Sequence, residues 1–252
     1  MNYRHITFAA AAILSSATVL TTAGSAEPRA VIELFTSQGC SSCPPADKLL
    51  GELSRDPSLV TLSLPVDYWD YLGWKDSLAI HGHTNRERAY ADARGDREVY
   101  TPQVVVNGVV QALGSDQAAI ESAIALTRST DAPLSLPVTM SIADGTVTVN
   151  VPAAKDNHRS GEVWLCPVTN AKPVAVGRGE NNGRTLTYYN VVRRWVKLGD
   201  WNGDAATFRV ALADLPNDDY SLKDVDHLAV LVQSGVAAKP GLMLGAATVN
   251  LH

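Results

Sequence analysis

Two cysteines separated by two residues are the part of this sequence best suited to chemistry. Cys40 and Cys43 follow a short apolar run, 30–35, and precede an apolar pattern with helical spacing. This order predicts a strand, a loop and a helix N-terminus that carries the cysteine pair. Free amides and the helix dipole favour a thiolate at such a position. Three chemistries stay open on this ground: a redox dithiol, half of a metal site, and a structural disulfide.

The order of the cysteines along the chain suggests a role for each of them. Cys40 comes first and lies on the predicted loop, so it is the expected nucleophile. Cys43 lies further in, where it could resolve a mixed disulfide. Pro44 and Pro45 follow at once, and proline is tolerated only where its missing amide would be unbonded anyway. The regular helix is therefore expected to begin near Cys43.

Composition and charge narrow the class of protein. The chain has 252 residues, of which 46% are apolar and 19% charged, which is ordinary for a globular protein of one large or two modest domains. The formal net charge is -5 and no long basic run occurs, which argues against nucleic acid as a partner. No cofactor is expected, and no hydrolase motif is present.

The first 26 residues have the pattern of a secretory signal peptide. A basic start, Met1–Arg4, precedes an apolar core, Phe8–Leu20, and small residues at 23–26. We expect cleavage after Ala26, no membrane insertion afterwards, and a periplasmic or secreted protein. Disulfides persist in such compartments. Three cysteines are too few for a disulfide-built scaffold, and Cys166, on a predicted strand, is expected to be a buried apolar residue.

The chain up to residue 130 alternates strands and helices. Two predicted strands with a helix between them should be parallel. An Asn107-Gly108 turn predicts an antiparallel hairpin. The predicted strands are 29–35, 59–66, 104–106 and 109–113, and the predicted helices follow residues 43, 76 and 115.

From residue 131 onward the apolar pattern has almost entirely a period of two. This pattern predicts an all-β, sandwich-like domain over 131–252. Its first two strands, 136–142 and 147–151, should form a hairpin. The other predicted strands are 163–168, 174–176, 185–192, 207–212, 228–232 and 246–251. The Gly-rich segment 177–184 lacks the context of a nucleotide-binding loop and is interpreted as a hairpin turn.

The element order and the cysteine motif, together with Thr101-Pro102 before the third strand, resemble the thioredoxin fold. The resemblance covers roughly residues 28–128 and implies an α/β thioredoxin-like domain over 27–130. It also implies that the Thr101–Pro102 bond is cis and lines a groove beside Cys40. The wider chain resembles a family of secreted bacterial thioredoxin-like proteins labelled a domain of unknown function. Gly39, where thioredoxins have Trp, and the Ser-Ser dipeptide leave the redox potential open.

Three further residues are candidates for the site. Thioredoxins carry a buried acid on the strand before the dithiol, and the resemblance assigns this proton-relay role to Glu33. The alternative is a salt-bridged strand residue. Trp69 and Trp74 belong to an aromatic loop that follows the second strand, and we expect them to contact substrate beside Thr101 and Pro102. Packing against the second domain is the competing interpretation.

The leading hypothesis is a thiol-disulfide oxidoreductase that acts on exported protein thiols or disulfides and works with an unknown redox partner. A second hypothesis is a binding or assembly module whose cysteine pair is a structural disulfide. A third is a periplasmic copper- or zinc-binding protein that uses the cysteines with His81 or His83. Ordinary solvated positions are the simpler interpretation of the two histidines, and no metal site is predicted.

Overall fold

The computed structural model describes residues 27–130, 133–155, 159–216 and 220–251. The predicted signal segment lies outside the described residues. The helices are α1 (Pro44–Leu53), α2 (His81–Arg94) and α3 (Gln117–Thr130). The strands are β1 (Ala30–Thr36), β2 (Leu59–Pro65), β3 (Gln103–Val106), β4 (Val110–Leu113), β5 (Thr139–Ala143), β6 (Thr146–Val151), β7 (Gly161–Ala175), β8 (Thr185–Val192), β9 (Val196–Trp201), β10 (Ala206–Ala211), β11 (His227–Val236) and β12 (Lys239–Asn250).

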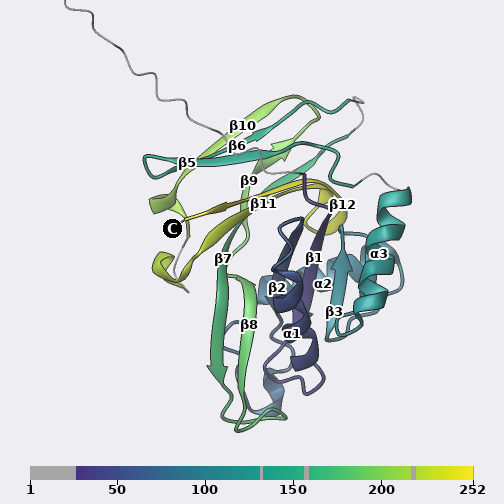
Figure 1. Cartoon of the computed structure of the whole chain (residues 1–252), viewed down its shortest axis with the longest axis vertical. Helices are drawn as coiled ribbons and strands as arrows, with labels where there is room; N and C mark the ends of the chain where they lie inside the picture. Colours follow the sequence, from purple (N-terminus) through teal and green to yellow (C-terminus); the bar gives the residue numbers. More distant parts are fainter. Residues whose placement is uncertain (1–26, 131–132, 156–158, 217–219, 252) are drawn as a thin grey trace, which may run out of the picture.

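A large mixed sheet dominates the fold. Its strand order is β12-β11-β7-β8-β2-β1-β3-β4, and β9 pairs with β7. The parallel pair β1–β2 and the antiparallel hairpin β3–β4 confirm the predicted orientations. β8 runs parallel to β2 and pairs with it at Ser63 and Val191. Strands from both sides of residue 130 are therefore neighbours in one sheet (Figure 1).

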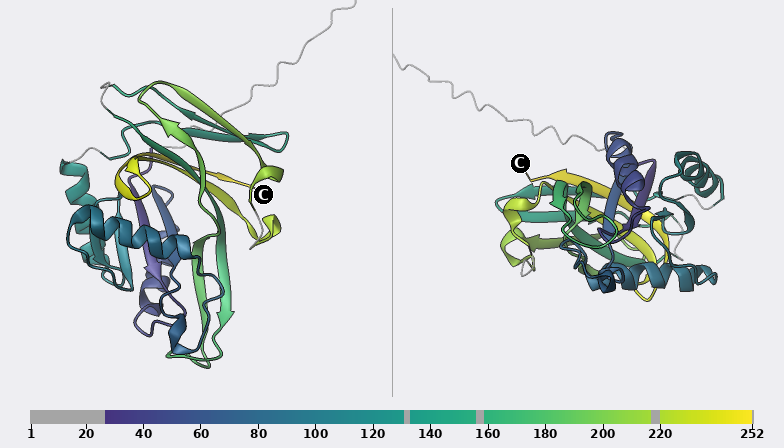
Figure 2. Two further views of the ribbon diagram at one scale, coloured as in Figure 1. Left: turned by 180° about the vertical axis from the view of Figure 1, so that it is seen from behind. Right: turned by 90° about the horizontal axis from the view of Figure 1, so that it is seen from below.

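Different helices cover the two faces of β1. Ile32 and Leu34 belong to an apolar cluster with residues of α1 and α3. Val31 and Phe35, which point the other way, share a cluster with Tyr90 of α2. Figure 2 shows α1 and α3 on one side of the sheet and α2 on the other. Because β1 is apolar on both faces, it is a fully buried central strand.

A second, three-stranded sheet in the order β10-β6-β5 packs against the large one. One apolar cluster joins the two sheets, with Val147 and Val149 of β6 packed among Val163 and Leu165 of β7 and Val230 of β11. The β5–β6 hairpin agrees with the prediction. The protein is thus a mixed α/β fold in which part of the second half extends the large sheet and part covers it.

Two strand predictions need correction. The segments 163–168 and 174–176 are parts of a single strand, β7, which pairs first with β9 and β11 and then with β8. The polar segment that includes Lys197 contains an unpredicted strand, β9. The Lys197 ammonium lies 2.6 Å from the Glu162 carboxylate and 2.7 Å from that of Asp200. Val196 and Leu198 alternate with Lys197, but the register with β7 shifts beside Lys197 and the next apolar residue is Trp201, so the period of two is too short to predict a strand.

Candidate functional site

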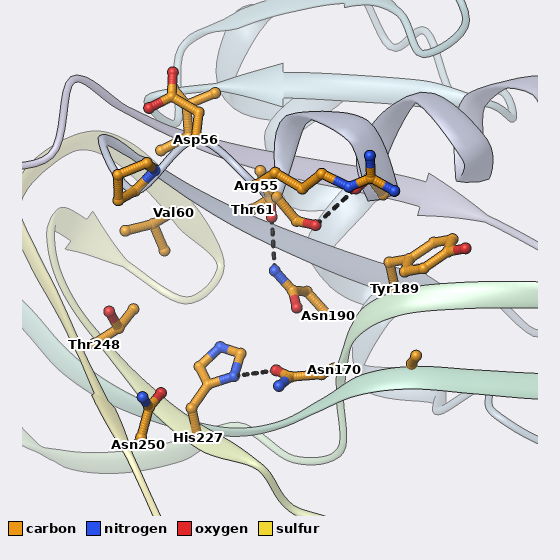
Figure 3. A pocket seen from close by; sticks show the side chains of 15 residues that line it. Arg55, Asp56, Val60, Thr61, Asn170, Tyr189, Asn190, His227, Thr248 and Asn250 are labelled. Atoms are coloured by element: carbon orange, nitrogen blue, oxygen red, sulfur yellow. Dashed lines mark hydrogen bonds between the residues drawn. The ribbon is translucent and has the colours of Figure 1, made fainter.

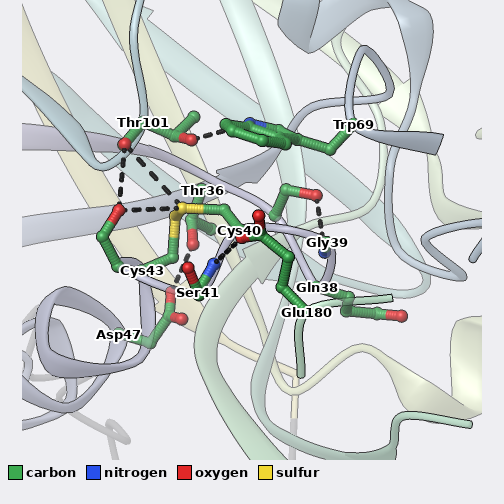
Figure 4. Close-up of a disulfide and its surroundings, with 12 residues drawn as sticks. Thr36, Gln38, Gly39, Cys40, Ser41, Cys43, Asp47, Trp69, Thr101 and Glu180 are labelled. Atoms are coloured by element: carbon green, nitrogen blue, oxygen red, sulfur yellow. Dashed lines mark hydrogen bonds between the residues drawn. A yellow bond between two sulfur atoms is a disulfide. The ribbon is translucent and has the colours of Figure 1, made fainter. Parts of the chain in front are cut away.

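Cys40 and Cys43 form a disulfide with a Cα–Cα distance of 5.4 Å. Cys40 lies in the loop after β1, and Cys43 is the residue before α1, whose first two positions are Pro44 and Pro45. Prolines fit there because first-turn amides have no acceptor inside the helix. Cys40 is 1% exposed and Cys43 0%, so almost none of the disulfide drawn in Figure 4 is open to solvent.

One wall of the site consists of Trp69 and the Thr101–Pro102 loop. The Thr101–Pro102 peptide bond is cis, as expected. The Thr101 carbonyl oxygen lies 3.8 Å from Cys40 Sγ, and the Trp69 indole N–H donates to Thr101 Oγ1 at 2.8 Å. A Cβ on Gly39 would stand 2.9 Å from the Trp69 Cβ. The predicted residues Trp69, Thr101 and Pro102 therefore do gather beside Cys40, and Gly39 lets them approach.

Trp74 contacts two segments. The first is the loop between β1 and α1, residues 37–43, which we call the cysteine loop, and the second is the hairpin tip, which we define as residues 176–184 between β7 and β8. The Trp74 indole N–H donates to Gln38 Oε1 at 2.8 Å, and a Cβ on Gly177 would stand 3.0 Å from its ring. The buried Asp76 carboxylate accepts a hydrogen bond from the Gln38 backbone amide at 2.7 Å. Burial raises the pKa of Asp76 to about 6, although bonds from backbone amides oppose the shift. Trp74 thus supports the loop and packs against the second half of the chain.

The hairpin tip binds the cysteine loop. The sequence does not predict this contact. The Asn181 side-chain amide is fully buried and donates to the carbonyl oxygens of Gln38 at 3.0 Å and Cys40 at 2.9 Å. The Glu180 carboxylate accepts from the Ser41 backbone amide at 3.0 Å. The sequence signals a turn here, but nothing local indicates what the turn contacts.

A buried acid, Asp47, lies one helical turn after Cys43. Its Oδ1 accepts from Thr36 Oγ1 at 2.8 Å, and its Oδ2 has no hydrogen-bond partner. Burial raises the pKa of Asp47 to about 8, opposed by the Thr36 bond and reinforced by the nearby charge of Asp76. The buried hydroxyl of Tyr188, also without a partner, has its pKa raised by burial and then by the charges of Asp47 and Asp76. The sequence does not single out Asp47, because the apolar pattern of its helix consists of Ala46, Leu49, Leu50 and Leu53.

Glu33 is buried elsewhere, on the face of β1 that α2 covers. Its carboxylate pairs with Arg86, with 2.6 Å between Nε and Oε1, and accepts from the Tyr90 hydroxyl at 2.5 Å. Arg86 also donates to Gln233 Oε1 at 2.9 Å and stacks 4.0 Å from the Trp195 ring centroid. The structure does not bring Glu33 together with the cysteines. Glu33 therefore has the position of a salt-bridged strand residue, which was the alternative to a proton-relay role.

The histidines and the third cysteine also lie away from the disulfide. His81 Nδ1 is 2.8 Å from the Asp67 carboxylate. His83 is buried with Nδ1 2.9 Å from the Pro65 carbonyl oxygen, and burial lowers its pKa to about 3. Cys166 is a free buried cysteine whose pKa is raised by burial. Among the described residues, no three His, Cys, Asp or Glu side chains gather closely enough to hold a metal ion.

A separate polar groove of about 570 Å³ lies between the end of α1, the start of β2 and strands β7, β8, β11 and β12. Its side chains bond to one another. The Asn190 amide donates to Thr61 Oγ1 at 2.8 Å, and His227 Nδ1 lies 2.7 Å from Asn170 Oδ1 (Figure 3). These bonds join β2 to β8 and β7 to β11, so the groove's polar groups connect strands across the sheet.

The fold and the site define a mixed α/β protein with a Cys-x-x-Cys disulfide at a helix N-terminus. Within the described residues, the helices are all too short or too polar to cross a bilayer. The model of DUF1223, a protein family of unknown function, matches residues 31–233. The chain therefore belongs to the DUF1223 family.

Two solved structures are similar to this chain. A crystal structure of a protein from Agrobacterium tumefaciens is 30% identical, with a TM-score of 0.77, and the match covers 89% of this chain and 95% of that one. The structure of HBP35 of Porphyromonas gingivalis is 14% identical, with a TM-score of 0.58, and the match covers 90% of this chain and 76% of that one. The second likeness concerns the fold alone. A search of curated proteins found no match.

Proposed function

We propose that this protein is a thioredoxin-like thiol-disulfide oxidoreductase that acts on other exported proteins. The observation that carries the proposal is the position of the Thr101 carbonyl oxygen, 3.8 Å from Cys40 Sγ, where an extended partner backbone would lie along the Thr101–Pro102 loop. The cysteine pair itself stands at a helix start, where thiolates are favoured. The signal-like N-terminal segment supports action outside the cytoplasm. The strands after residue 130 form a β-sandwich-like part that also extends the sheet.

The exchange proceeds in two steps. In the reduced protein, the Cys40 thiolate attacks one sulfur of a partner disulfide, and the other partner sulfur leaves as a thiolate. The Cys43 thiolate then attacks Cys40 Sγ, which releases the second partner sulfur as a thiolate and forms the Cys40–Cys43 disulfide. Two electrons and two protons pass to the partner. A protein dithiol that acts as electron donor regenerates the reduced form.

Asp47 is the acid we propose for the second step, in place of Glu33. It lies one turn from Cys43, at the start of the helix that follows that residue. With its pKa raised to about 8 it is mostly protonated at neutral pH, and its ionised form, which gains population as the pH approaches 8, is the form that can take a proton. Thr36 holds one carboxylate oxygen and leaves the other without a partner. Asp47 would accept the Cys43 proton as that thiol becomes the attacking thiolate.

The test is a trapping experiment in the full exported chain. Cys43→Ala removes the resolving thiol, so partner proteins should remain bound to Cys40 as mixed disulfides that dithiothreitol releases. Cys40→Ala is the matched control, because Cys43 stays buried and should trap nothing. If both variants show the same set of adducts in exported extracts, the exchange function is refuted.

A second candidate function is a binding or assembly module with a structural disulfide. The burial of both cysteines favours it, because 1% and 0% exposure leave little sulfur for a partner to reach. Equilibration with glutathione buffers separates the two. A structural disulfide resists reduction, with a potential below about -300 mV, whereas an exchangeable pair equilibrates at a higher potential.

A further inference from the structure

The amides around the cysteine pair are largely unavailable to a thiolate. Pro44 and Pro45 occupy the first two positions of α1 and have no N–H to donate. The Cys43 amide already donates to the Cys40 carbonyl oxygen at 3.3 Å. The helix start therefore offers a Cys40 thiolate fewer donors than an ordinary helix N-terminus would.

The amide of Ser41, between the two cysteines, is also occupied. It donates at 3.0 Å to the carboxylate of Glu180, which reaches over from the hairpin tip 139 residues later in the chain. Hydrogen bonding from the Ser41 side chain and then from its backbone amide holds the pKa of Glu180 below its usual range, against a weaker opposing effect of desolvation, so the carboxylate is ionised at neutral pH. An anion thus lies against the backbone between the two cysteines and occupies the Ser41 donor (Figure 4).

We propose that Glu180 is a positioning residue that destabilises the Cys40 thiolate, so that the site favours its disulfide and the reduced protein donates electrons to partner disulfides. The direction of electron flow rests on the proposed function. The physical argument is that a dithiol whose thiolate is poorly stabilised is the more reducing one, and a well-stabilised thiolate makes a strong oxidant. The partners would be proteins with disulfides to be reduced.

Other charged groups lie near the cysteine loop, and they are the same in all the variants compared below. Arg184 donates to Asn181 Oδ1 at 2.7 Å within the hairpin tip. Asp76 accepts from the Gln38 amide, and Asp47 lies under the loop on α1. Glu180 differs from these groups because its carboxylate bonds an amide between the two cysteines.

Ser42 acts in the opposite direction to Glu180. Its hydroxyl lies 3.4 Å from Cys40 Sγ and 3.5 Å from the Thr101 carbonyl oxygen. In the reduced protein this hydroxyl can turn from the carbonyl to the thiolate and donate to it. Ser42→Ala should therefore lower the thiolate fraction, whereas removal of Glu180 should raise it. The opposite signs make the two variants a useful pair.

The experiment measures the pKa of Cys40 in the Cys43→Ala background of the full chain. Cys166 is buried, so ultraviolet thiolate absorbance and the pH dependence of alkylation by iodoacetamide report Cys40. Glu180→Gln removes the charge and keeps an acceptor, and Glu180→Ala removes both. Glu52→Gln, which removes an exposed carboxylate near the C-terminal end of α1, is the matched control. Thermal unfolding of each variant checks that the fold is intact.

At low salt and at a pH below the Cys40 pKa, Glu180→Gln should raise the thiolate fraction about threefold, as expected for an exposed charge, and added salt should diminish this rise. Glu180→Ala should raise it further, and Glu52→Gln should leave it unchanged. In glutathione buffers above the Cys40 pKa, Glu180→Ala should shift the equilibrium toward the dithiol. An unchanged or increased Cys40 pKa in both Glu180 variants would overturn the proposal.

The two proposals fail in different ways. The pKa measurement follows Cys40, since the other remaining thiol, Cys166, is buried and its pKa is raised by burial. It uses a small alkylating reagent, so it needs no partner protein. Absence of trapped partners in the Cys43→Ala experiment would refute the exchange function and leave the assignment of Glu180 standing. An unchanged Cys40 pKa would refute the assignment of Glu180 and leave the exchange function standing.

Discussion

Replacement of Asp47 by Asn should remove a pH-dependent loss of stability that the buried carboxyl causes. Asp47 is 3% exposed, and burial raises its pKa from 3.8 to about 8. Below pH 3.8 the folded and unfolded chains both hold the proton. Between these two pKa values only the folded protein holds it, so unfolding releases a proton and the free energy of unfolding falls as the pH rises.

The magnitude follows from the slope of about 1.4 kcal/mol per pH unit for one proton. Between about pH 5 and about pH 7, Asp47 should lower the stability of the oxidised wild-type protein by about 2.7 kcal/mol. Asp47→Asn keeps the shape of the side chain and has no proton to lose in this range. The stability advantage of the variant over wild type should therefore grow by about that amount between the two pH values.

Urea unfolding of oxidised protein at several pH values measures this difference. Asp76 and Glu87, whose pKa values burial raises to about 6 and about 8, remain in both proteins and largely cancel in the comparison. Glu52→Gln, on the exposed side of α1, should follow the wild-type profile. If wild type and Asp47→Asn give parallel profiles, then Asp47 does not hold its proton in the folded state, and the argument for its part in proton transfer fails with it.

Three other substitutions test contacts described above. Arg86→Met leaves the Glu33 carboxylate buried without its partner and should cost about 3–5 kcal/mol in urea unfolding; the double variant with Glu33→Gln should recover part of this, and no recovery would contradict the ion pair. Asn181→Ala should cost about 1–3 kcal/mol and speed reduction of the disulfide by dithiothreitol, so an unchanged rate would show that the hairpin tip does not restrain the loop. Gly39→Ala places a methyl group 2.9 Å from the Trp69 Cβ and should cost about 1–3 kcal/mol in urea unfolding; a wild-type free energy of unfolding would contradict this contact.

The sequence predicts the elements next to the cysteines well because their signals are local. An apolar strand, a Cys-x-x-Cys loop with prolines, and a helix with apolar residues at helical spacing lie within 25 residues of one another. The Asn107-Gly108 turn likewise predicts the β3–β4 hairpin that the structure contains. These features need no knowledge of distant contacts.

The choice between Glu33 and Asp47 could not be made from sequence alone. β1 is apolar on both faces, so its pattern does not say whether Glu33 points toward α1 or away from it. The structure resolves this through Arg86, a residue 53 positions away that pairs with Glu33. Asp47 is not part of the apolar pattern of its helix, which consists of Ala46, Leu49, Leu50 and Leu53, so its burial follows from the packing around the helix and not from the pattern.

The hairpin tip illustrates a second limit. Asn182-Gly183 predicts a turn, and the turn exists, but its function depends on contacts made 139 to 143 residues away. The prediction of two separate strands where the structure has the single strand β7 failed for the same reason, because it depends on a distant contact. The two apolar segments of β7 are separated by polar residues that only the pairing with β8 keeps in strand conformation. Local sequence patterns indicate which conformation a segment prefers, and pairing with distant strands determines which conformation it adopts.

The distance along the chain between the cysteines and the hairpin tip also affects how the protein is made. Asn181 follows Cys40 by 141 residues, so during synthesis the cysteine pair emerges long before the segment that binds its loop. For that interval the nascent thiols lack the hairpin's two carbonyl contacts and the Glu180 carboxylate. The loop that carries the cysteine pair therefore acquires the contacts of the finished site only when the last third of the chain has folded against it.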